Sequence, residues 1–201
     1  MRVVINEANF RKKCAPAVGR ALIKYLSPKI NRAVKSSNTT LLETFLNHAI
    51  TQEILAGPMS TNFSNTLGGH GNLFSFLGFE AGSEPVAKVA EFLASCIEVE
   101  GVRHVRGTFK VNVSVRMPKK EEIEELSELP WANRSWVYAM ETGIAGLGSY
   151  LYSTKGFETS RSDKGIQASK TVRSGRFIAT EYMSTILNAI PRHLVSSLKA
   201  V

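Results

Sequence analysis

Histidines, cysteines and clustered acids are the residues of this chain whose side chains could do chemistry. The four histidines (His48, His70, His104 and His193) are spread over different segments, and none stands at a metal-site spacing from a second ligand. No His-Glu-x-x-His, Cys-x-x-Cys or Gly-x-Ser-x-Gly pattern occurs. The acids of residues 121–128 are most simply one face of a solvated helix. We therefore predict no catalytic residues, no metal and no cofactor, and a protein that is not an enzyme.

Two glycine-rich segments resemble nucleotide-binding loops only superficially. Residues 68–72, Gly-Gly-His-Gly-Asn, lack the Lys-Ser/Thr of a P-loop and follow no apolar strand. Residues 143–148 read Gly-x-x-Gly-x-Gly, which is not the dinucleotide fingerprint. Neither segment predicts a phosphate site. Cys14 and Cys96 both lie in apolar patterns, which favours free buried thiols and a reducing compartment.

Both tryptophans and three of the five tyrosines lie in residues 131–152, among Gly143, Gly146 and Gly148. Large aromatics bury more apolar area than other side chains, so such a cluster is either the packing centre of the domain or a loop shaped for a partner. We interpret it as the packing centre. Its proposed members are Trp131, Trp136, Tyr138, Tyr150 and Tyr152.

The elements that must position these residues follow from periodicity and punctuation. Asn6 is a plausible cap for a first helix that kinks or begins at Pro16 and closes at Pro28, and residues 36–40 indicate a loop. The further elements expected are a helix over 42–54 ended by Gly57-Pro58, a short apolar stretch at 73–79, a helix over 85–97, a strand over 109–117, an acidic helix or linker over 119–129, a possible strand over 166–172, and a helix over 182–198 kinked at Pro191.

These elements predict an α+β fold with a small, mainly antiparallel sheet packed by several helices, and an extended loop or arm for contacts between subunits. The chain reads as a single domain of residues 1–201, with a basic helical region at 1–37 and an exposed basic loop at 153–176. No apolar run approaches the roughly 20 residues that span a bilayer. The first residues also do not resemble a signal peptide, so we expect no membrane partner.

The formal charge of +8 is unevenly distributed. Residues 1–37 carry +8, residues 38–154 carry −5 and residues 155–201 carry +5. Basic ends around an acidic middle are compatible with nucleic-acid binding, and equally with the ends of one subunit docking on the middle of another. The bases of the first helix are either a solvated face or an electrostatic docking surface. The proposed interface residues of the basic loop are Arg161, Lys164, Lys170, Arg173 and Arg176.

Two stretches together resemble a known group of proteins. The first runs from the second helix through Gly-Gly-His-Gly-Asn-Leu-Phe-Ser-Phe-Leu-Gly-Phe (68–79) to Ile97-Glu98-Val99, and the second is the Trp-centred segment 133–151 with its Gly-Leu-Gly-x-Tyr. Ser-Arg-Ser-Asp-Lys-Gly (160–165) and a terminal helix follow. Over roughly residues 38–190 the order resembles the neck, or head-to-tail connector, proteins of tailed bacteriophages, related to the tail-completion group.

The resemblance implies a structural virion protein, assembled in the host cytoplasm, that forms an oligomeric ring. Its partners would be copies of itself, the portal-side connector and the tail proteins. Genomic DNA would pass through the lumen without sequence-specific binding. The alternative function is a non-enzymatic DNA-binding protein that uses the basic N- and C-terminal regions.

Overall fold

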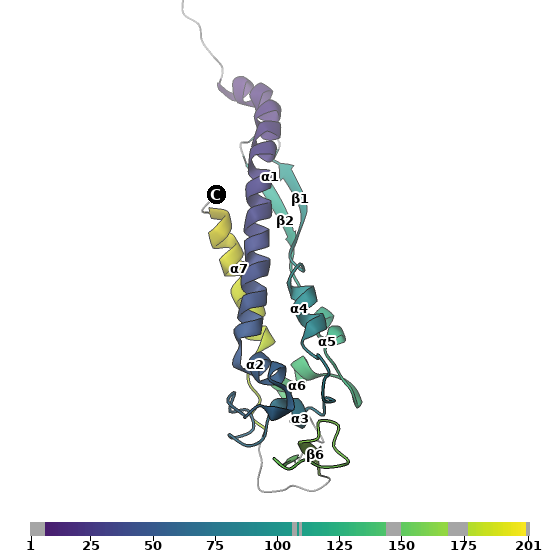
Figure 1. Cartoon of the computed structure of the whole chain (residues 1–201). Coiled ribbons are helices and arrows are strands. Elements are labelled where there is room, and N and C mark those ends of the chain that lie inside the picture. The colour runs from purple at the N-terminus through teal and green to yellow at the C-terminus, as the bar shows by residue number, and fades with distance from the viewer. Residues whose placement is uncertain (1–6, 106–107, 109, 144–149, 169–176, 200–201) are drawn as a thin grey trace, which may run out of the picture.

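The computed structural model describes residues 7–105, 108, 110–143, 150–168 and 177–199, with side chains from Cys14 onward. The fold is α+β, as predicted, but the strands do not form one sheet. Among the described residues they make three separate antiparallel pairs, β1–β2, β3–β4 and β5–β6. The molecule is elongated, with one long helix running through most of its length and the smaller elements gathered at the end away from the N-terminus (Figure 1).

The long helix, α1 (Glu7–Asn47), has 41 residues, which corresponds to about 60 Å at about 1.5 Å per residue. Our prediction that the chain breaks at Pro28 and at residues 36–40 is wrong, because both lie inside this helix. At Pro28 the helix lacks one amide donor, and the preceding Ser27 hydroxyl donates a hydrogen bond to the Ile23 carbonyl.

The polar residues that suggested a loop at 36–40 are bonded to distant parts of the chain or back into the helix. Asn38 donates from Nδ2 to the Ile97 carbonyl and accepts from the Ile97 amide, both at 3.0 Å. The Ser37 hydroxyl oxygen lies 3.2 Å from Nδ1 of His193 in the C-terminal helix, within hydrogen-bond distance. Thr39 donates to the carbonyl of Lys35 one turn earlier. Tertiary partners therefore satisfy groups that would otherwise compete with the helix.

The hairpin of β1 (Glu98–His104) and β2 (Val111–Arg116) pairs antiparallel and lies alongside α1 (Figure 1). The residues of β2 alternate between half-buried and exposed, so the period-two pattern predicted this strand correctly. The hairpin approaches α1 closely at Gly19, where an added Cβ would lie 2.4 Å from Cγ of His104. Only a residue without a side chain fits that contact unless the hairpin moves.

Short elements build the opposite end. They are α2 (Ala49–Leu55), η1 (Gly57–Met59), α3 (Leu73–Phe76), α4 (Ala87–Leu93), α5 (Lys120–Leu126), β3 (Glu128–Leu129), β4 (Ala132–Ser135), α6 (Trp136–Thr142), β5 (Tyr150–Tyr152) and β6 (Gly165–Gln167). The C-terminal helix α7 (Met183–Lys199) packs back along α1 and contains Pro191, close to the predicted bounds. No described helix is long and apolar enough to cross a membrane.

The core of this end is aromatic. Trp136 and Tyr182 are both fully buried, with ring centroids 6.2 Å apart, and the Phe45 ring centroid also lies 6.2 Å from that of Tyr182. Among the proposed packing-centre residues, Trp136 is at the centre, whereas Trp131, Tyr150 and Tyr152 are half-buried. Tyr138 is 46% exposed, so its assignment to the packing centre is wrong.

Tyr138 is exposed because of the way in which α6 begins. Ser135 caps α6 by accepting a hydrogen bond from the Tyr138 amide, which fixes where the helix begins. The same cap directs Trp136, Val137 and Met140 into the core, and Tyr138 faces solvent. Aromatic content alone did not reveal which face of the helix each ring would take.

A buried carboxylate organises the glycine-rich segment. Glu53 in α2 is fully buried and accepts hydrogen bonds from the Leu73 amide at 2.7 Å, the Ser64 amide at 3.0 Å and Asn62 Nδ2 at 2.9 Å. Asn62 in turn accepts from the amides of Leu67 and Gly69. The segment that resembles a phosphate loop therefore has amide donors committed to side chains of its own chain.

Candidate interaction surfaces

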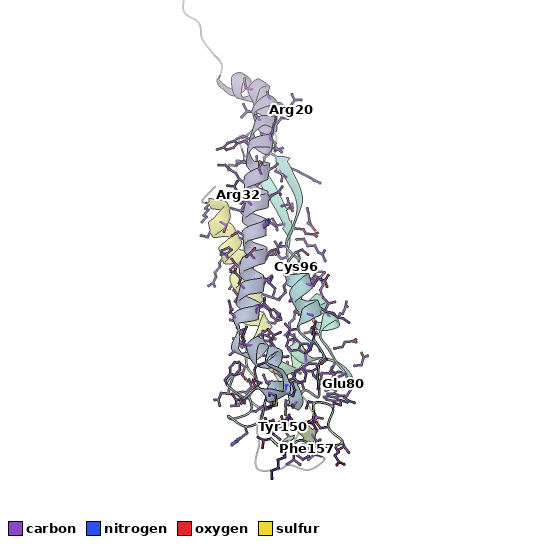
Figure 2. The ribbon with its side chains drawn as sticks, viewed as in Figure 1. Arg20, Arg32, Glu80, Cys96, Tyr150 and Phe157 are labelled. Carbon is purple, nitrogen blue, oxygen red and sulfur yellow. The ribbon has the colours of Figure 1, made fainter. Side chains whose placement is uncertain are left out.

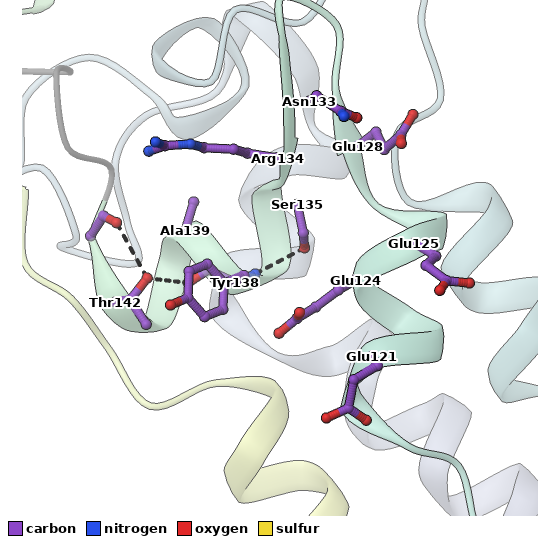
Figure 3. Close-up of a pocket in the computed structure, with 11 residues that line it drawn as sticks. Glu121, Glu124, Glu125, Glu128, Asn133, Arg134, Ser135, Tyr138, Ala139 and Thr142 are labelled. Atoms are coloured by element: carbon purple, nitrogen blue, oxygen red, sulfur yellow. Dashed lines mark hydrogen bonds between the residues drawn. The ribbon is translucent and has the colours of Figure 1, made fainter.

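A hollow of about 740 Å³ lies between α5, β4 and α6 and is walled by glutamates. Figure 3 shows Glu121, Glu124 and Glu125 of α5 on one side and Arg134 and Tyr138 on the other. Ile123 is fully buried, so the helical repeat turns these neighbouring glutamates toward the surface. The acidic helix of the sequence is thus one wall of a concave surface.

The orientation of α5 is fixed at both of its ends. At the start, Glu122 accepts from the Lys119 amide at 2.9 Å and forms an ion pair with Arg116 of β2. The pKa of Glu122 lies below its usual value, mainly because of the bond from the Lys119 amide. At the end, the Ser127 hydroxyl lies 2.6 Å from that of Ser135, and the Trp136 amide donates to the Ser127 carbonyl.

A second, smaller hollow of about 340 Å³ lies on the other side of α5, and Glu125 and Glu128 line both. Acids outside α5 extend the surface there. We call the whole set the α5 acidic surface, which comprises Glu80, Glu84, Glu121, Glu124, Glu125 and Glu128. The linings of the two hollows contain only two bases, Lys88 and Arg134. The amino-acid sequence does not reveal this grouping, because Glu80 and Glu84 lie some 40 residues from α5 in the chain.

Lys120 pairs with one member of this surface, because its ammonium lies 4.0 Å from the Glu124 carboxylate, but its closer partner lies outside the surface. Its ammonium lies 2.5 Å from the Glu141 carboxylate, and the hydrogen bond to Glu141 raises the pKa of Lys120. Glu141 also accepts from the Ser184 amide at 2.6 Å and so caps the start of α7. Burial by itself would raise the pKa of Glu141, but the bonds from Lys120 and Ser184 outweigh it and hold the pKa below its usual value.

The opposite charge lies on α1. Residues 8–42 contain no acid, and Arg20, Lys24, Arg32 and Lys35 are all exposed. At about 100° per residue these four bases fall within about a third of the helix circumference. Lys29 lies at the edge of this group with its ammonium 4.4 Å from the Tyr25 ring centroid. We call Arg20, Lys24, Arg32 and Lys35 the α1 basic face.

The basic loop is more ordered than the sequence indicated. Residues 153–165 close the β5–β6 hairpin through bonds that include Phe157 amide to Asp163 carbonyl and Gly165 amide to the Ser160 hydroxyl. The glycine and serine residues of 160–165 predict turns or an exposed loop, and the structure has hydrogen-bonded turns there. Arg161 is exposed beside a hollow of about 410 Å³, and Lys164 donates to the Thr154 carbonyl. Lys170, Arg173 and Arg176 lie outside the described residues.

An apolar surface lies near the same end of the molecule. Leu55, Met59 and Phe63 follow one another along α2, η1 and the next loop, and they are 52%, 73% and 53% exposed. The Glu53 bonds to Asn62 and Ser64 hold that loop against α2. Exposed apolar side chains grouped in this way are typical of surfaces that contact other proteins.

The chemistry-bearing residues named from the sequence do not come together. Within the described part of the chain, no three His, Cys, Asp or Glu residues are arranged to hold a metal ion. His48 caps α2, His104 packs on Gly19 and His193 bonds Ser37. Cys14 and Cys96 are both free thiols, and burial raises the pKa of Cys96 to about 11. Comparison with known proteins finds no matching family model, curated protein or solved structure.

Proposed function

We propose that this protein is a structural subunit of the neck of a tailed bacteriophage, where it forms a ring that joins the head connector to the tail. The sequence resemblance over roughly residues 38–190 motivates the proposal. The observation that carries it is the charge polarity of the subunit, because the α1 basic face and the α5 acidic surface lie on different parts of one elongated chain. A subunit with two different complementary surfaces associates head to tail, and such contacts close into rings when the rotation permits.

The remaining surfaces suit contacts with other virion proteins. Leu55, Met59 and Phe63 offer an apolar contact at one end of the molecule. Arg161 offers a cation beside the hollow near Trp131. In this proposal the segment 161–176 contacts a neighbouring subunit or a tail protein, and DNA passes through the lumen held only by charge.

Joining of heads to tails tests the proposal directly. Purified protein would be added to phage heads and tails from a lysate that lacks the neck subunit, and joined particles would be counted by electron microscopy. We expect wild-type protein to restore joining and to be found at the junction. The Arg161→Glu variant should restore fewer particles, and the Lys155→Glu variant, with a similar charge change on the same hairpin, should act like wild type. Failure of wild-type protein to restore joining would refute the proposal.

The α1 basic face supports a second candidate, a DNA-binding protein without sequence specificity. Bases that neutralise phosphates release counterions, so binding would weaken steeply with salt. Titration of duplex DNA at two salt concentrations separates the candidates. Tight, salt-sensitive binding by the isolated subunit would favour the second candidate over the neck.

A further inference from the structure

We propose that the α1 basic face of one subunit docks on the α5 acidic surface of a second copy. This inference rests on the proposed ring and names the two surfaces through which its subunits meet. It assigns one occupant to each of two exposed surfaces of opposite charge.

The α1 basic face lies on the solvent-exposed side of the helix. The buried side of α1 includes Ala15, Ile30, Ala33 and Val34, which face α7 and the β1–β2 hairpin. The opposite side, where the bases lie, also carries Ala17, Ala21 and Asn31, which are all exposed. No described acid forms an ion pair with Arg20, Lys24, Arg32 or Lys35. The face is basic and carries the small residues Ala17 and Ala21 between the charges, so a second surface can approach it closely there.

The α5 acidic surface is complementary in sign and shape. Glu121, Glu125 and Glu128 are exposed and have no ion-pair partner among the described residues. They line hollows of about 740 and 340 Å³ on the two sides of α5. A concave acidic surface can receive long basic side chains, whose stems pack on the walls while the charged ends reach the carboxylates.

The two surfaces cannot meet within one subunit. Arg20 and Arg32 lie along the half of the molecule nearer the N-terminus, whereas Glu80 lies near the other end (Figure 2). α1 is one continuous helix over this distance, so it cannot fold back on α5. A contact between different surfaces of two copies leaves one of each surface free at the ends, and the assembly grows until it closes.

A second copy explains more of the molecule than DNA does. Duplex DNA would neutralise the α1 basic face but would leave Glu121, Glu125 and Glu128 of the α5 acidic surface without an ion-pair partner among the described residues. A neighbouring subunit neutralises both at once. Individual surface ion pairs stabilise little, but several that form together fix the register and speed the encounter. Association should therefore weaken as salt shortens the range of the charges.

Charge reversal with exchange tests the docking. The basic-face variant is Lys24→Glu/Arg32→Glu/Lys35→Glu, and the acidic-surface variant is Glu121→Lys/Glu125→Lys/Glu128→Lys. A matched control, Lys155→Glu/Arg192→Glu/Lys199→Glu, reverses three other exposed bases. Self-association would be followed by sedimentation velocity at low and high salt, after circular dichroism has shown that each variant is folded.

We expect each interface variant to associate at least about tenfold more weakly than wild type, while the control associates normally. Mixing the two interface variants should restore association, because each normal surface meets its normal complement and the two reversed surfaces match each other. A chain that carries all six reversals should also associate. Restoration cannot result from a purely structural defect in either variant.

Three outcomes would overturn the docking. They are wild-type protein that stays monomeric at high concentration, interface variants that associate like wild type, and weakened variants that do not recover on mixing. Loss of DNA binding without loss of assembly in the basic-face variant would assign that face to DNA instead. If the variants fail to associate but recover on mixing, and wild type nevertheless does not join heads to tails, the docking stands and the neck function fails.

Discussion

The two ends of this molecule are stabilised in different ways. One end, which we call the base, consists of α2 to α6, the β5–β6 hairpin, the last turns of α1 and the start of α7. It buries Trp136, Tyr182 and Phe45 completely. The other end, which we call the shaft, is residues 14–35 of α1 with the β1–β2 hairpin. Among its described residues it buries few, and none of them is aromatic. They are Ala15, Gly19, Ile30, Ala33 and Val34.

The difference indicates which end of the molecule is stabilised by its own core and which end exposes a charged surface. Burial of large aromatic groups within the chain stabilises the base. The shaft buries one side of a single helix and leaves its charged side exposed. A helix in this situation gains further stability only from another surface. The predictions below test this division, from the base outward.

Truncation of the buried Trp136 side chain should lower the free energy of unfolding more than any other change. Trp136→Ala should lower the free energy of unfolding by about 3–5 kcal/mol, because it opens a cavity among fully buried rings. Tyr138→Ala, two residues away on the exposed side of α6, should cost less than about 1 kcal/mol. Urea unfolding followed by fluorescence of the remaining Trp131 measures the first, and circular dichroism measures both. Equal effects at the two positions would contradict the assigned burial.

Replacement of the buried Glu53 carboxylate should have the second-largest effect on the free energy of unfolding. Glu53→Gln keeps the side-chain size but turns an amide toward the donors of Asn62, Ser64 and Leu73. We expect a loss of about 2–3 kcal/mol, because bonds to a charged acceptor are lost and buried donors stay unpaired. Glu43→Gln on the exposed side of α1 is the control and should be nearly neutral. A neutral Glu53→Gln variant would show that this carboxylate does not hold the glycine-rich segment.

The Glu141 cap should make the stability of the aromatic end of the molecule, the base, depend on pH. The pKa of Glu141 is below its usual value in the folded chain, so its stabilisation is complete above the unfolded pKa of about 4.3 and is lost as pH falls through the lower, folded pKa. At neutral pH, Glu141→Gln should cost about 1–2 kcal/mol. The gap between the unfolding free energies of wild type and variant should narrow as pH falls below about 4.3, as measured by unfolding at each pH. A constant gap would show that ionisation of Glu141 is unimportant.

Disruption of the contact between Gly19 and His104 in the shaft should have the smallest effect on global stability. Alanine normally stabilises a helix by about 1 kcal/mol relative to glycine. At Gly19, however, the new Cβ would meet the His104 ring. We expect Gly19→Ala to speed hydrogen exchange in β1 and β2 while changing global stability by less than about 1 kcal/mol. Gly19→Ala/His104→Ala, which removes the clash, should restore part of the protection. Unchanged exchange in Gly19→Ala would mean that the hairpin does not depend on this contact.

The sequence by itself determined the elements whose pattern repeats locally. Alternation over residues 109–117 gave β2, and helical spacing over 182–198 gave α7 despite Pro191. The uneven charge was also visible, because residues 8–42 lack acids. These features depend on neighbours within a few positions, so their periodicity reports them directly.

Only the tertiary structure decided how competing local preferences were resolved. Residues 36–40 have the side chains of a loop, yet they are helical because Asn38 bonds Ile97 and Ser37 bonds His193, residues far away in the chain. Glu80 and Glu84 join α5 in one acidic surface because the chain folds back between them. The reason is the same in each case. A polar side chain takes the partner that lowers its free energy most in the folded state, and the spacing of residues in the sequence does not reveal a distant partner.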